Sequence, residues 1–539
     1  MNKKNISAVI ILLLITIVAS PSVYPQTVYT PLNSSIYNYL DRLATEHIIV
    51  LNDEVKPYSR KTIAGYLITA VEKSAMLNKV EKEELEWYKE EYAEEMKLKN
   101  ERWFLYKYSD SLFSFRVTPM GGYGISRTGD AHGHTRWWGI STYGNISDLL
   151  GVSFSYKDIG QFGSNVDYKK DFTPERAYDI NSNPSGGIEF SDVKGAVNFT
   201  WNWGSVSLIK DDIRWGHGNF GQLILSDKPE SYPQIRLFIK PAEWFRFYYI
   251  HGWLNSLVYD SSKFYYNHLE SVHPIQYKSY INKYIAANML TVTPLNNLDV
   301  SIGNSVIYSG ELRPEFFIPF LYYKVMDHNT GRGDVEDSNG QIYFDISSRN
   351  LPNFQFYSTV FIDCGSIRGL LKGDLHEWWC GYTLGVKTVN VFIPNLDLIV
   401  EYTKLGPWVY EHKYDTETYK HIGVTLGDWL GQNADQFRIQ ADYKLSRPLA
   451  IHLYFERLRK GGLADNSLAY FSTVTIPFLY GPLRKDFNIG ITADYEIFHD
   501  LYASGLYEYS NITDGDKTRT QQFLLGDKNN FSFTLSLGL

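Results

Sequence analysis

The last nine residues of the chain alternate between apolar and small or polar side chains. In Phe531-Ser532-Phe533-Thr534-Leu535-Ser536-Leu537-Gly538-Leu539, every odd position is apolar. Successive residues of a β-strand point to opposite faces, so this pattern predicts a strand with one apolar and one polar face. A strand at the end of a chain leaves a bare sheet edge unless another strand pairs with it. We therefore expect a closed barrel in which this strand pairs with the first barrel strand, near Phe113–Ile125.

Alternation with a period of two continues from about Phe113 onward, with clear examples at Phe245–Tyr249, Leu396–Tyr402 and Leu449–Phe455. Clusters of turn-forming residues separate these runs: Asn296-Asn297, Ser338-Asn339-Gly340, Lys460-Gly461-Gly462 and Asp514-Gly515-Asp516. The roughly 430 residues from 111 to 539 can supply about 16–20 antiparallel strands of membrane-spanning length. We expect an all-β transmembrane antiparallel barrel of about 18 strands. Polar residues on the presumed inner face then make a wet wall: Arg236, Arg246, His452 and Glu456.

Residues 27–110 carry a helical pattern instead and predict a small N-terminal three-helix domain. Ser34 or Ser35 can cap a first helix, and Pro57-Tyr58-Ser59 opens a second. A third helix begins near Asn78, where Glu81 can complete a capping box. The predicted apolar stripes are Ile36, Tyr39, Leu40 and Leu43; Ile63, Leu67, Ala70 and Val71; and Leu85, Tyr88, Tyr92 and Met96. We interpret the many Glu and Lys residues of the third helix as a solvated face.

The start of the chain has the pattern of a secretory signal peptide. A basic head is followed by an apolar run from Ile6 to Ala19 and by small residues, and we place cleavage at residues 20–26. The apolar run is too short for a spanning helix. Because no later stretch approaches 18 uninterrupted apolar residues and the mean hydropathy is −0.28, a helical membrane protein is excluded. An exported barrel belongs in the outer membrane of a Gram-negative cell, with the helical domain in the periplasm.

Composition supports the barrel. Aromatic residues make up 16% of the chain, and a barrel uses them as girdles at the membrane interfaces, although a large soluble β-sandwich or propeller also carries many. The net charge of −8 argues against nucleic acid as a partner. Cys364 and Cys380 flank an expected hairpin, and the sequence leaves open whether they pair or remain free thiols.

One polar stretch has the composition of a ligand-binding loop. Asp211, Asp212, Arg214, Trp215 and His217 lie together among glycines. Sugars bind to aromatic faces, while charged groups hydrogen-bond to their hydroxyls, so these residue types fit a polysaccharide. The same composition fits a barrel loop folded inward as a structural plug, and the sequence alone favours the plug.

A second stretch, within residues 401–435, contributes Trp408, His412 and His421 as candidate polysaccharide-binding residues. The two histidines lack a third suitably spaced ligand, so we expect no metal site. A third stretch runs from Arg313-Pro314-Glu315 through Phe316–Tyr323 to an acidic segment, Asp327–Asp345. Its oxygen spacing matches no calcium loop, and we interpret it as a solvated loop.

The chain lacks the sequence patterns of outer-membrane hydrolases. It has no Gly-x-Ser-x-Gly nucleophile elbow, no phosphate loop and no cysteine-based zinc site. We therefore expect a non-enzymatic protein with no catalytic residues, no metal and no cofactor.

The same stretches resemble the capsule-assembly Wzi family of outer-membrane proteins. The resemblance is carried by Ile36–Leu67, by Trp215–Leu237 (Trp-Gly-x-Gly, Leu-x-Leu-Ser-Asp, Pro) and by Glu401–Asp435. It implies a barrel of about 18 strands with a periplasmic helical bundle at its lower end. It also implies a lectin-like role in holding capsular-type polysaccharide at the cell surface. One departure is the final Leu539, because many such barrels end in an aromatic residue.

The resemblance and the export signal define the expected partners. These are surface polysaccharide, outer-membrane lipid and lipopolysaccharide, and the barrel-assembly machinery, with a polysaccharide exporter as a further candidate. The alternative function is a porin or solute channel. It is supported by Leu40, Leu43 and Ala44 followed by residues 57–65, which resemble a degenerate surface-layer repeat that binds cell-wall polymers at the front of some porins.

Overall fold

The structure is a computed structural model of the chain. It describes residues 28–99, 102–110, 112–146, 149–178, 181–183, 187–263, 265–267, 275–325, 338–364, 379–463 and 476–538, without the side chains of 181–183, 265–267, 275–277 and Cys364. The expected signal peptide, residues 1–26, lies outside the described residues. No helix in these ranges is long and apolar enough to cross a membrane.

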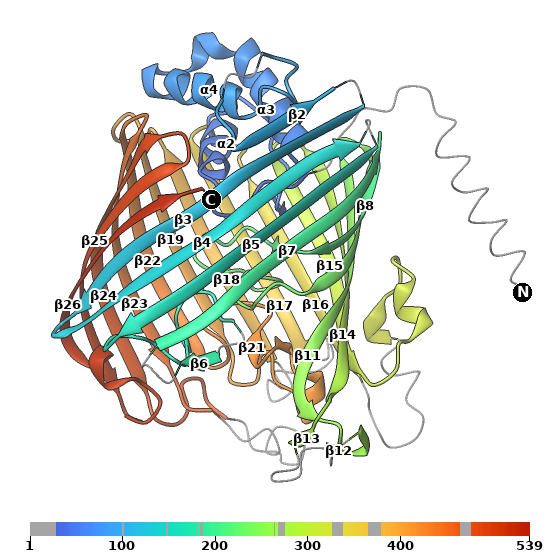
Figure 1. Ribbon diagram of the computed structural model, residues 1–539, viewed down its shortest axis with the longest axis vertical. Coiled ribbons are helices and arrows are strands. Elements are labelled where there is room, and N and C mark those ends of the chain that lie inside the picture. Colours follow the sequence, from blue (N-terminus) through green and yellow to red (C-terminus); the bar gives the residue numbers. More distant parts are fainter. Residues whose placement is uncertain are drawn as a thin grey trace, which may run out of the picture.

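Within the described residues, eighteen antiparallel strands form a closed barrel (Figure 1). They are β3 (Phe113–Thr128), β4 (Ala131–Ile146), β5 (Leu150–Gly163), β7 (Gly187–Trp201), β8 (Gly204–Lys210), β10 (Pro233–Ala242), β11 (Phe245–Tyr259), β14 (Tyr280–Leu295), β15 (Leu298–Ser309), β16 (Ser338–Ser348), β17 (Phe354–Cys364), β18 (Trp379–Val389), β19 (Leu396–Leu405), β22 (Ala434–Ser446), β23 (Leu449–Lys460), β24 (Arg484–Phe498), β25 (Leu501–Asp514) and β26 (Gly526–Leu537).

Shorter elements accompany the wall. The helices are α2 (Ile36–Thr45), α3 (Arg60–Glu72) and α4 (Lys79–Glu91), with short 3-10 turns η1 (Ser74–Met76), η2 (Ser261–Lys263), η3 (Pro314–Phe317), η4 (Asp415–Glu417) and η5 (Gln522–Leu524). The short strands are β1 (Val55–Lys56), β2 (Tyr106–Ser109), β6 (Asn181–Asn183), β9 (Arg214–Trp215), β12 (Tyr265–Asn267), β13 (Ile275–Tyr277), β20 (Lys420–His421) and β21 (Val424–Thr425).

The barrel closes where the sequence predicts. In β26, Phe533 pairs with Ile125 of β3 and Leu537 pairs with Gly121, so the terminal strand has a partner along its length. Phe531, Phe533 and Leu535 are 51%, 51% and 42% exposed on the outside. Similar outward apolar residues occur around the wall: Trp138, Phe154, Leu208, Ile302, Phe344, Leu384, Leu453 and Ile489. An exposed apolar surface of this extent is stable in contact with lipid.

The two rims of the barrel differ. Strands such as β14 and β15, or β24 and β25, are joined by two-residue turns at one rim, which we call the short-turn rim. Long connections, including residues 164–186 and 406–433, leave the opposite rim, which we call the loop rim. The helices cover the short-turn rim, where the last strand also ends (Figure 1).

The helical domain has the core that the sequence predicts. Ile36, Tyr39, Leu40 and Leu43 of α2 pack with Ile63, Leu67 and Ala70 of α3, with Leu85 and Tyr88 of α4 and with Tyr92, which follows α4, while Met96 is partly buried. The capping box at Asn78 and Glu81 is present. Ser35 occupies the N-cap position of α2, as predicted, but its side chain makes no capping hydrogen bond. Val71 is 38% exposed, so its assignment to the apolar stripe is wrong.

The third helix is less solvated than predicted. Glu81 and Glu84 are buried, because Glu84 pairs with Lys444 of β22 at 3.2 Å and Glu81 pairs with Arg42 at 3.2 Å. Arg42 also reaches Asp397 of β19 at 3.2 Å. Ion pairs between the helices and the barrel wall therefore hold the domain on the short-turn rim.

A segment after β15 lies against the outside of the barrel. We call residues Arg313–Val325 the strap; in Figure 1 it is the yellow-green segment beside β14. Its Phe316 and Tyr323 are fully buried against outward residues of β11, β14 and β15, including Tyr249 and Tyr308. The amide of Asn288, which points outward, donates to the carbonyls of Pro319 and Leu321, both at 2.8 Å. The strap thus satisfies polar groups on the lipid-facing wall.

Two further predictions for this region need correction. Ser338-Asn339-Gly340 begins strand β16 rather than forming a turn, because it pairs with Tyr308, Ile307 and Val306 of β15. Asp345, assigned to a solvated acidic loop, lies within β16 and is buried inside the barrel. The prediction for residues 327–337 lies outside the described residues.

Candidate functional site

The connection between β8 and β10, residues 211–232, folds into the barrel. Trp215, Leu223, Ile224 and Leu225 are buried in the core of the lumen, and Trp215 forms a bridge to Leu225. Burial of these apolar side chains removes them from water. The sequence leaves two hypotheses for the Asp211–Gly221 stretch, a ligand-binding loop and a loop folded inward as a structural plug. The central residues of the stretch are folded inward.

This inward loop meets the helical domain inside the barrel. Strand β9 pairs with β1, so that Trp215 faces Val55 and Arg214 faces Lys56. The turn that follows requires Gly216, whose φ is +104° and whose added Cβ would lie 3.3 Å from Thr359 Oγ1. The inward loop and the β1 segment together fill the middle of the lumen.

His217 is held between two carboxylates from different elements. Its Nε2 lies 2.9 Å from Asp53 Oδ1, and its Nδ1 lies 2.5 Å from Asp345 Oδ2. Burial lowers the pKa of His217, but Asp345 and Asp53 raise it well above its ordinary value. Arg349 completes the cluster by donating to Asp53 Oδ2 at 2.6 Å. His217 is therefore a cationic bridge between the helical domain and the wall.

The connection between β19 and β22, residues 406–433, packs beside the inward loop. Trp408 is buried, and Tyr410 and Tyr419 donate to the carbonyls of Leu223 and Ile224 at 2.7 and 2.8 Å. His412 lies 3.2 Å from Glu417. Trp408 also lies against Trp379 of β18, whereas the His412 contact with Glu417 is within the loop.

His421 satisfies a backbone hydrogen-bond donor of a barrel strand. Its Nδ1 accepts a hydrogen bond from the backbone N–H of Asn255 in β11 at 3.0 Å. Burial, together with the charges of Lys283 and Lys210, lowers the pKa of His421 to about 3, so the ring is neutral and can accept this bond. In the described part of the chain, no group of three His, Cys, Asp or Glu side chains could hold a metal ion. Cys380 has a free thiol; the Cys364 side chain lies outside the described set.

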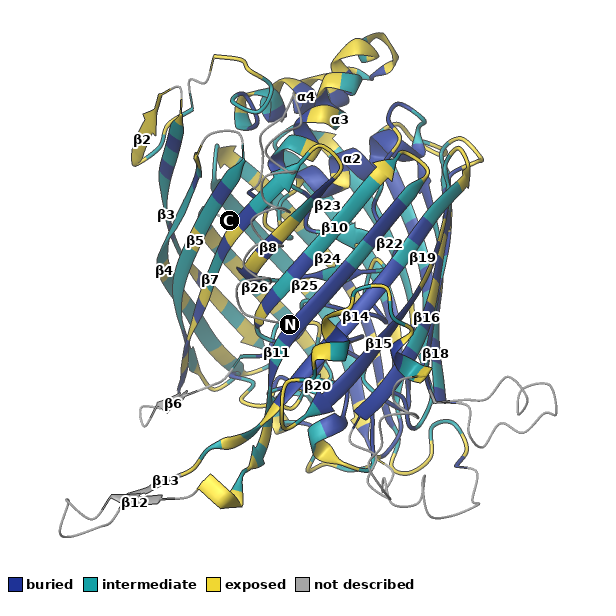
Figure 2. Ribbon diagram, turned by 90° about the vertical axis from the view of Figure 1, so that its right-hand side faces the viewer, coloured by how far each residue is buried: buried dark blue, intermediate teal, exposed yellow. Residues whose placement is uncertain are grey.

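The packing of these loops leaves one sector of the wall more open. Strands β15 to β18 are mostly buried, whereas β4 and β5 are mostly half-buried (Figure 2). The inner face of β4 and β5 carries small and polar residues: Thr135, Ser141, Ser153, Ser155 and Gln161.

A pocket of about 260 Å³ lies on this open sector, and we call it the wall pocket. Its lining includes Trp137 of β4, Lys157 of β5, Phe190 of β7, and Arg176 and Tyr178 from the loop after β5. The Lys157 ammonium lies 5.0 Å from the Trp137 ring, and the rings of Tyr178 and Phe190 stack at 4.3 Å. The pocket combines flat aromatic faces with fixed charges.

Gly122 of β3 allows the Trp137 ring to lie close to the wall. A Cβ added at Gly122 would lie 2.1 Å from Trp137 Cζ2 and 2.7 Å from the carbonyl oxygen of Leu535. The adjacent Trp138 points to the other face of β4 and is 63% exposed on the outside. A tryptophan pair in one strand therefore supplies one inner and one outer indole.

Asp211 and Asp212 connect the wall pocket to the inward loop. Arg176 Nη1 donates to Asp212 Oδ2 at 2.7 Å, and Lys194 Nζ donates to the same oxygen at 2.5 Å. Burial raises the pKa of Asp212, but the positive charges of Arg176 and Lys194 lower it by a larger amount, so that the pKa is about 2. The carboxylate stays charged and fixes the Arg176 side chain at the pocket.

The candidate polysaccharide-binding residues from the sequence therefore fall into three groups according to their surroundings. Asp211 and Asp212 are half-buried beside the wall pocket, and Arg214 forms a two-pronged pair with Asp227 at 2.7 Å. Trp215, His217, Trp408, His412 and His421 are buried among protein groups. Sequence reasoning missed Trp137, Lys157, Arg176 and Lys194, although the adjacent tryptophans 137 and 138 in an alternating strand were a signal for an inward ring.

A sequence model of the family described as capsule assembly protein Wzi matches residues 151–523, more than half of the chain. The chain belongs to the Wzi capsule assembly family. No match was found among curated proteins by sequence. The chain is an outer-membrane barrel, in agreement with its closed wall and apolar outer surface.

One solved structure supports the fold. Wzi of Escherichia coli, an outer-membrane protein involved in group 1 capsule assembly and described as a carbohydrate-binding β-barrel, is 12% identical with a TM-score of 0.58. The match covers 96% of this chain and 99% of that one. OprD of Pseudomonas aeruginosa is 10% identical with a TM-score of 0.42, covering 78% and 94% of the two chains. OccAB1 of Acinetobacter baumannii is 10% identical with a TM-score of 0.43, covering 79% and 95%.

Proposed function

We propose that this protein binds surface polysaccharide of the capsular type at the wall pocket and holds it without chemical turnover. The observation that carries the proposal is the Trp137 ring beside Arg176 and Lys157 on the open sector of the lumen. The weakly positive C–H face of a sugar ring stacks on an indole, and guanidinium and ammonium groups donate to its hydroxyls.

Family membership supports this role, as does the carbohydrate binding described for the Escherichia coli protein. We propose that Asp211 and Asp212 act by fixing Arg176 and Lys194 rather than by touching the sugar. Asp212 is engaged with these two side chains, so it has little capacity left for a ligand.

We further propose that the helical domain faces the periplasm and the loop rim faces the cell exterior. Short turns on the periplasmic side and longer loops outside are the usual arrangement in outer-membrane barrels. Lipid and lipopolysaccharide then surround the wall, the barrel-assembly machinery inserts it, and a polysaccharide exporter delivers the ligand. A protein of this kind needs no cofactor and no catalytic residue.

Glycan binding by the purified full-length protein tests the proposal. Trp137→Ala should weaken binding roughly tenfold, about 1.4 kcal/mol, whereas Trp138→Ala removes the neighbouring outer indole and should leave binding unchanged. In cells lacking the protein, polysaccharide should pass into the medium instead of remaining attached. Equal binding by the two variants, or unchanged attachment in the deletion strain, would refute the proposed role.

A further inference from the structure

A second and larger cavity lies at the short-turn rim, between α3 and the barrel wall. Its volume is about 1410 Å³, which exceeds the roughly 300–1,000 Å³ typical of pockets for small ligands. The wall side is formed by the ends of β7, β8, β10 and β11, and the floor includes Ile213 and Trp215 of the inward loop. We call it the rim cavity.

Helix α3 presents one complete face to the rim cavity. Lys61, Thr62, Gly65, Ile68 and Thr69 line it, and this spacing of three and four residues marks a single stripe. Ile63, Leu67 and Ala70 form the other stripe and pack into the helical core. Ile68 is 44% exposed, so an apolar side chain remains uncovered on the cavity side.

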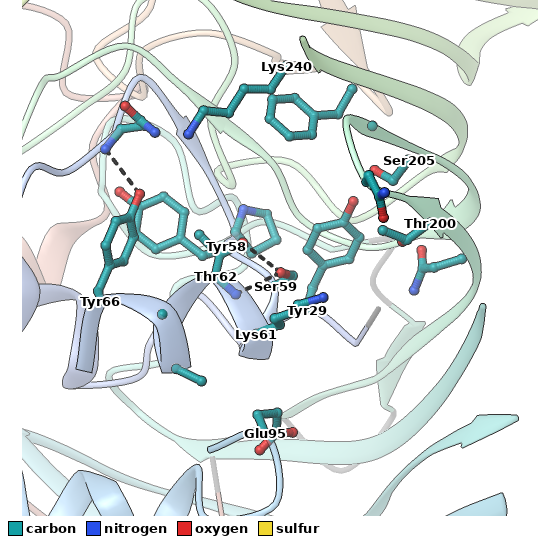
Figure 3. A pocket seen from close by; sticks show the side chains of 18 of the residues that line it. Tyr29, Tyr58, Ser59, Lys61, Thr62, Tyr66, Glu95, Thr200, Ser205 and Lys240 are labelled. Atoms are coloured by element: carbon teal, nitrogen blue, oxygen red, sulfur yellow. Dashed lines mark hydrogen bonds between the residues drawn. The ribbon is translucent and has the colours of Figure 1, made fainter. Parts of the chain in front are cut away.

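Aromatic rings line the rim cavity on both sides. Figure 3 shows Tyr58 and Tyr66 on the side of α3, and Tyr29 next to Thr200 and Ser205 of the wall. Trp201, Trp203, Phe238 and Tyr248 complete the aromatic lining. Aromatic faces attract the C–H surfaces of a ligand, while Tyr and Trp also offer polar edges.

Several residues that line the cavity each carry a buried polar atom with no hydrogen-bond partner among the described residues. These atoms are Tyr58 Oη, Asn145 Oδ1, Thr200 Oγ1, Trp201 Nε1 and Trp215 Nε1. Buried polar groups in folded proteins are nearly always paired. The indole nitrogens can only donate, the amide oxygen can only accept, and the hydroxyls can do both. Hydroxyl groups of a ligand would match this mixture, whereas an acyl chain would leave every one of these atoms unpaired.

Charged groups from both walls of the lining are engaged with the protein. Glu95 accepts from Arg60 Nε at 2.6 Å, Lys240 pairs with Glu243 at 2.6 Å, and Arg236 donates to the carbonyl of Asp211 at 2.9 Å. The whole lining carries five cationic and four anionic side chains, so neither sign of charge dominates it. An uncharged ligand fits this lining best.

We propose that the rim cavity is a second glycan site, which binds a segment of an uncharged, hydroxyl-rich oligosaccharide from the side of the helical domain. This inference rests on the proposed function and adds a ligand class and a location to it. The stretch from Asp212 to Trp215 separates the two sites, because Asp212 bonds to Arg176 of the wall pocket and Trp215 lines the rim cavity. The protein thus contacts glycan on both sides of its plug.

Gly65 allows the rim cavity to be filled without disturbing its walls. No atom lies within 4 Å of a Cβ added there, so Gly65→Trp can extend into the open space. Gly65→Ala is the matched control, because it leaves the space open and raises helix propensity. A second test variant, Thr200→Val with Asn145→Leu, removes two unpartnered polar atoms at nearly constant volume.

The experiment is titration of the full-length protein in detergent with neutral hexasaccharides of glucose, galactose and mannose, and with an acidic uronate hexasaccharide. Wild type and Gly65→Ala should show two classes of site for a neutral hexasaccharide. Gly65→Trp and the Thr200→Val, Asn145→Leu variant should each weaken one class at least tenfold, and Trp137→Ala should weaken the other. Migration of unheated protein on gels confirms that each barrel is folded.

The outcomes separate the two proposals. Binding that falls in Trp137→Ala but is unchanged in both cavity variants overturns the rim site and leaves the proposed function standing. Binding that falls in the cavity variants but not in Trp137→Ala supports the rim site and rejects the wall pocket. Preference of the Gly65-dependent site for the acidic hexasaccharide contradicts the uncharged ligand, and absence of binding to every probe overturns both proposals.

Discussion

His217 Nε2 lies 2.9 Å from Asp53 Oδ1, and this contact joins the inward loop of the barrel to the helical domain. Both side chains are buried, and both also bind wall residues, Asp345 for His217 and Arg349 for Asp53. The cluster therefore connects the inward loop, the helical domain and the barrel wall, and its removal should affect all three.

Replacement of His217 by Gln should weaken the docking of the helical domain. The change leaves Asp53 and Asp345 without their shared cation, and loss of one member of a buried ion pair typically costs about 3–5 kcal/mol. Thermal unfolding in detergent and proteolysis of residues 28–99 measure the effect. Arg127→Gln, at a side chain 63% exposed beside Asp130, should change neither.

The same cluster predicts a dependence of stability on pH. The folded-state pKa of His217 is raised, so its stabilising contribution is complete below its unfolded value of about 6.5. The contribution is lost as the pH rises through the higher folded-state value. The difference in unfolding free energy between wild type and His217→Gln should therefore shrink above neutral pH. A difference that grows between pH 7 and 10 would contradict the assigned charge on His217.

Asp428 should destabilise the protein at alkaline pH. It is fully buried, and burial together with Glu401 raises its pKa to about 7. Because the unfolded pKa is about 3.9, stability is lost as the pH rises through the range between these two values. Asp428→Asn should be more stable than wild type at pH 8 and similar to it at pH 4. Chemical denaturation at the two pH values measures this, and equal effects at both would reject the prediction.

The strap should open when its buried ring is removed. Phe316 is fully buried, and truncation of a buried phenylalanine to alanine costs about 3–5 kcal/mol. Trypsin should then cleave Phe316→Ala faster after Lys324, whose ammonium is held by the carbonyls of Gly340 and Asp363. Phe320→Ala, at a ring that is 65% exposed, is the matched control and should resist cleavage like wild type.

The elements that could be predicted are those whose signal is local. The alternation of residues 531–539 predicts a strand with one apolar and one polar face. Because the edge of this strand must be paired, few partner strands are available, and Phe533 pairs with Ile125 as predicted. The capping box at Asn78 and Glu81 depends on residues three apart and could also be recognised. The prediction of a turn at Ser338–Gly340 is wrong, because pairing with β15 outweighs the preference of an Asn-Gly pair for a turn.

The candidate site was less accessible to prediction because its parts come from distant segments. The polar stretch at Asp211 was recognised, but its partners Arg176 and Lys194 come from a loop and a strand that only the barrel register brings together. His217 has the residue type of a ligand contact, yet its partners Asp53 and Asp345 lie 164 and 128 positions away in the sequence. No local pattern distinguishes such a histidine from an exposed one.

The strap gives the barrel an uneven outline in the plane of the membrane. Over β11, β14 and β15, lipid meets Ile318 and Phe320 of the strap instead of the strands beneath them, while around β25 and β26 it meets the strands directly. One sector of the protein is therefore two layers thick. A neighbouring molecule that approaches from this side would contact the strap. A molecule that approaches from any other side would contact the barrel strands directly.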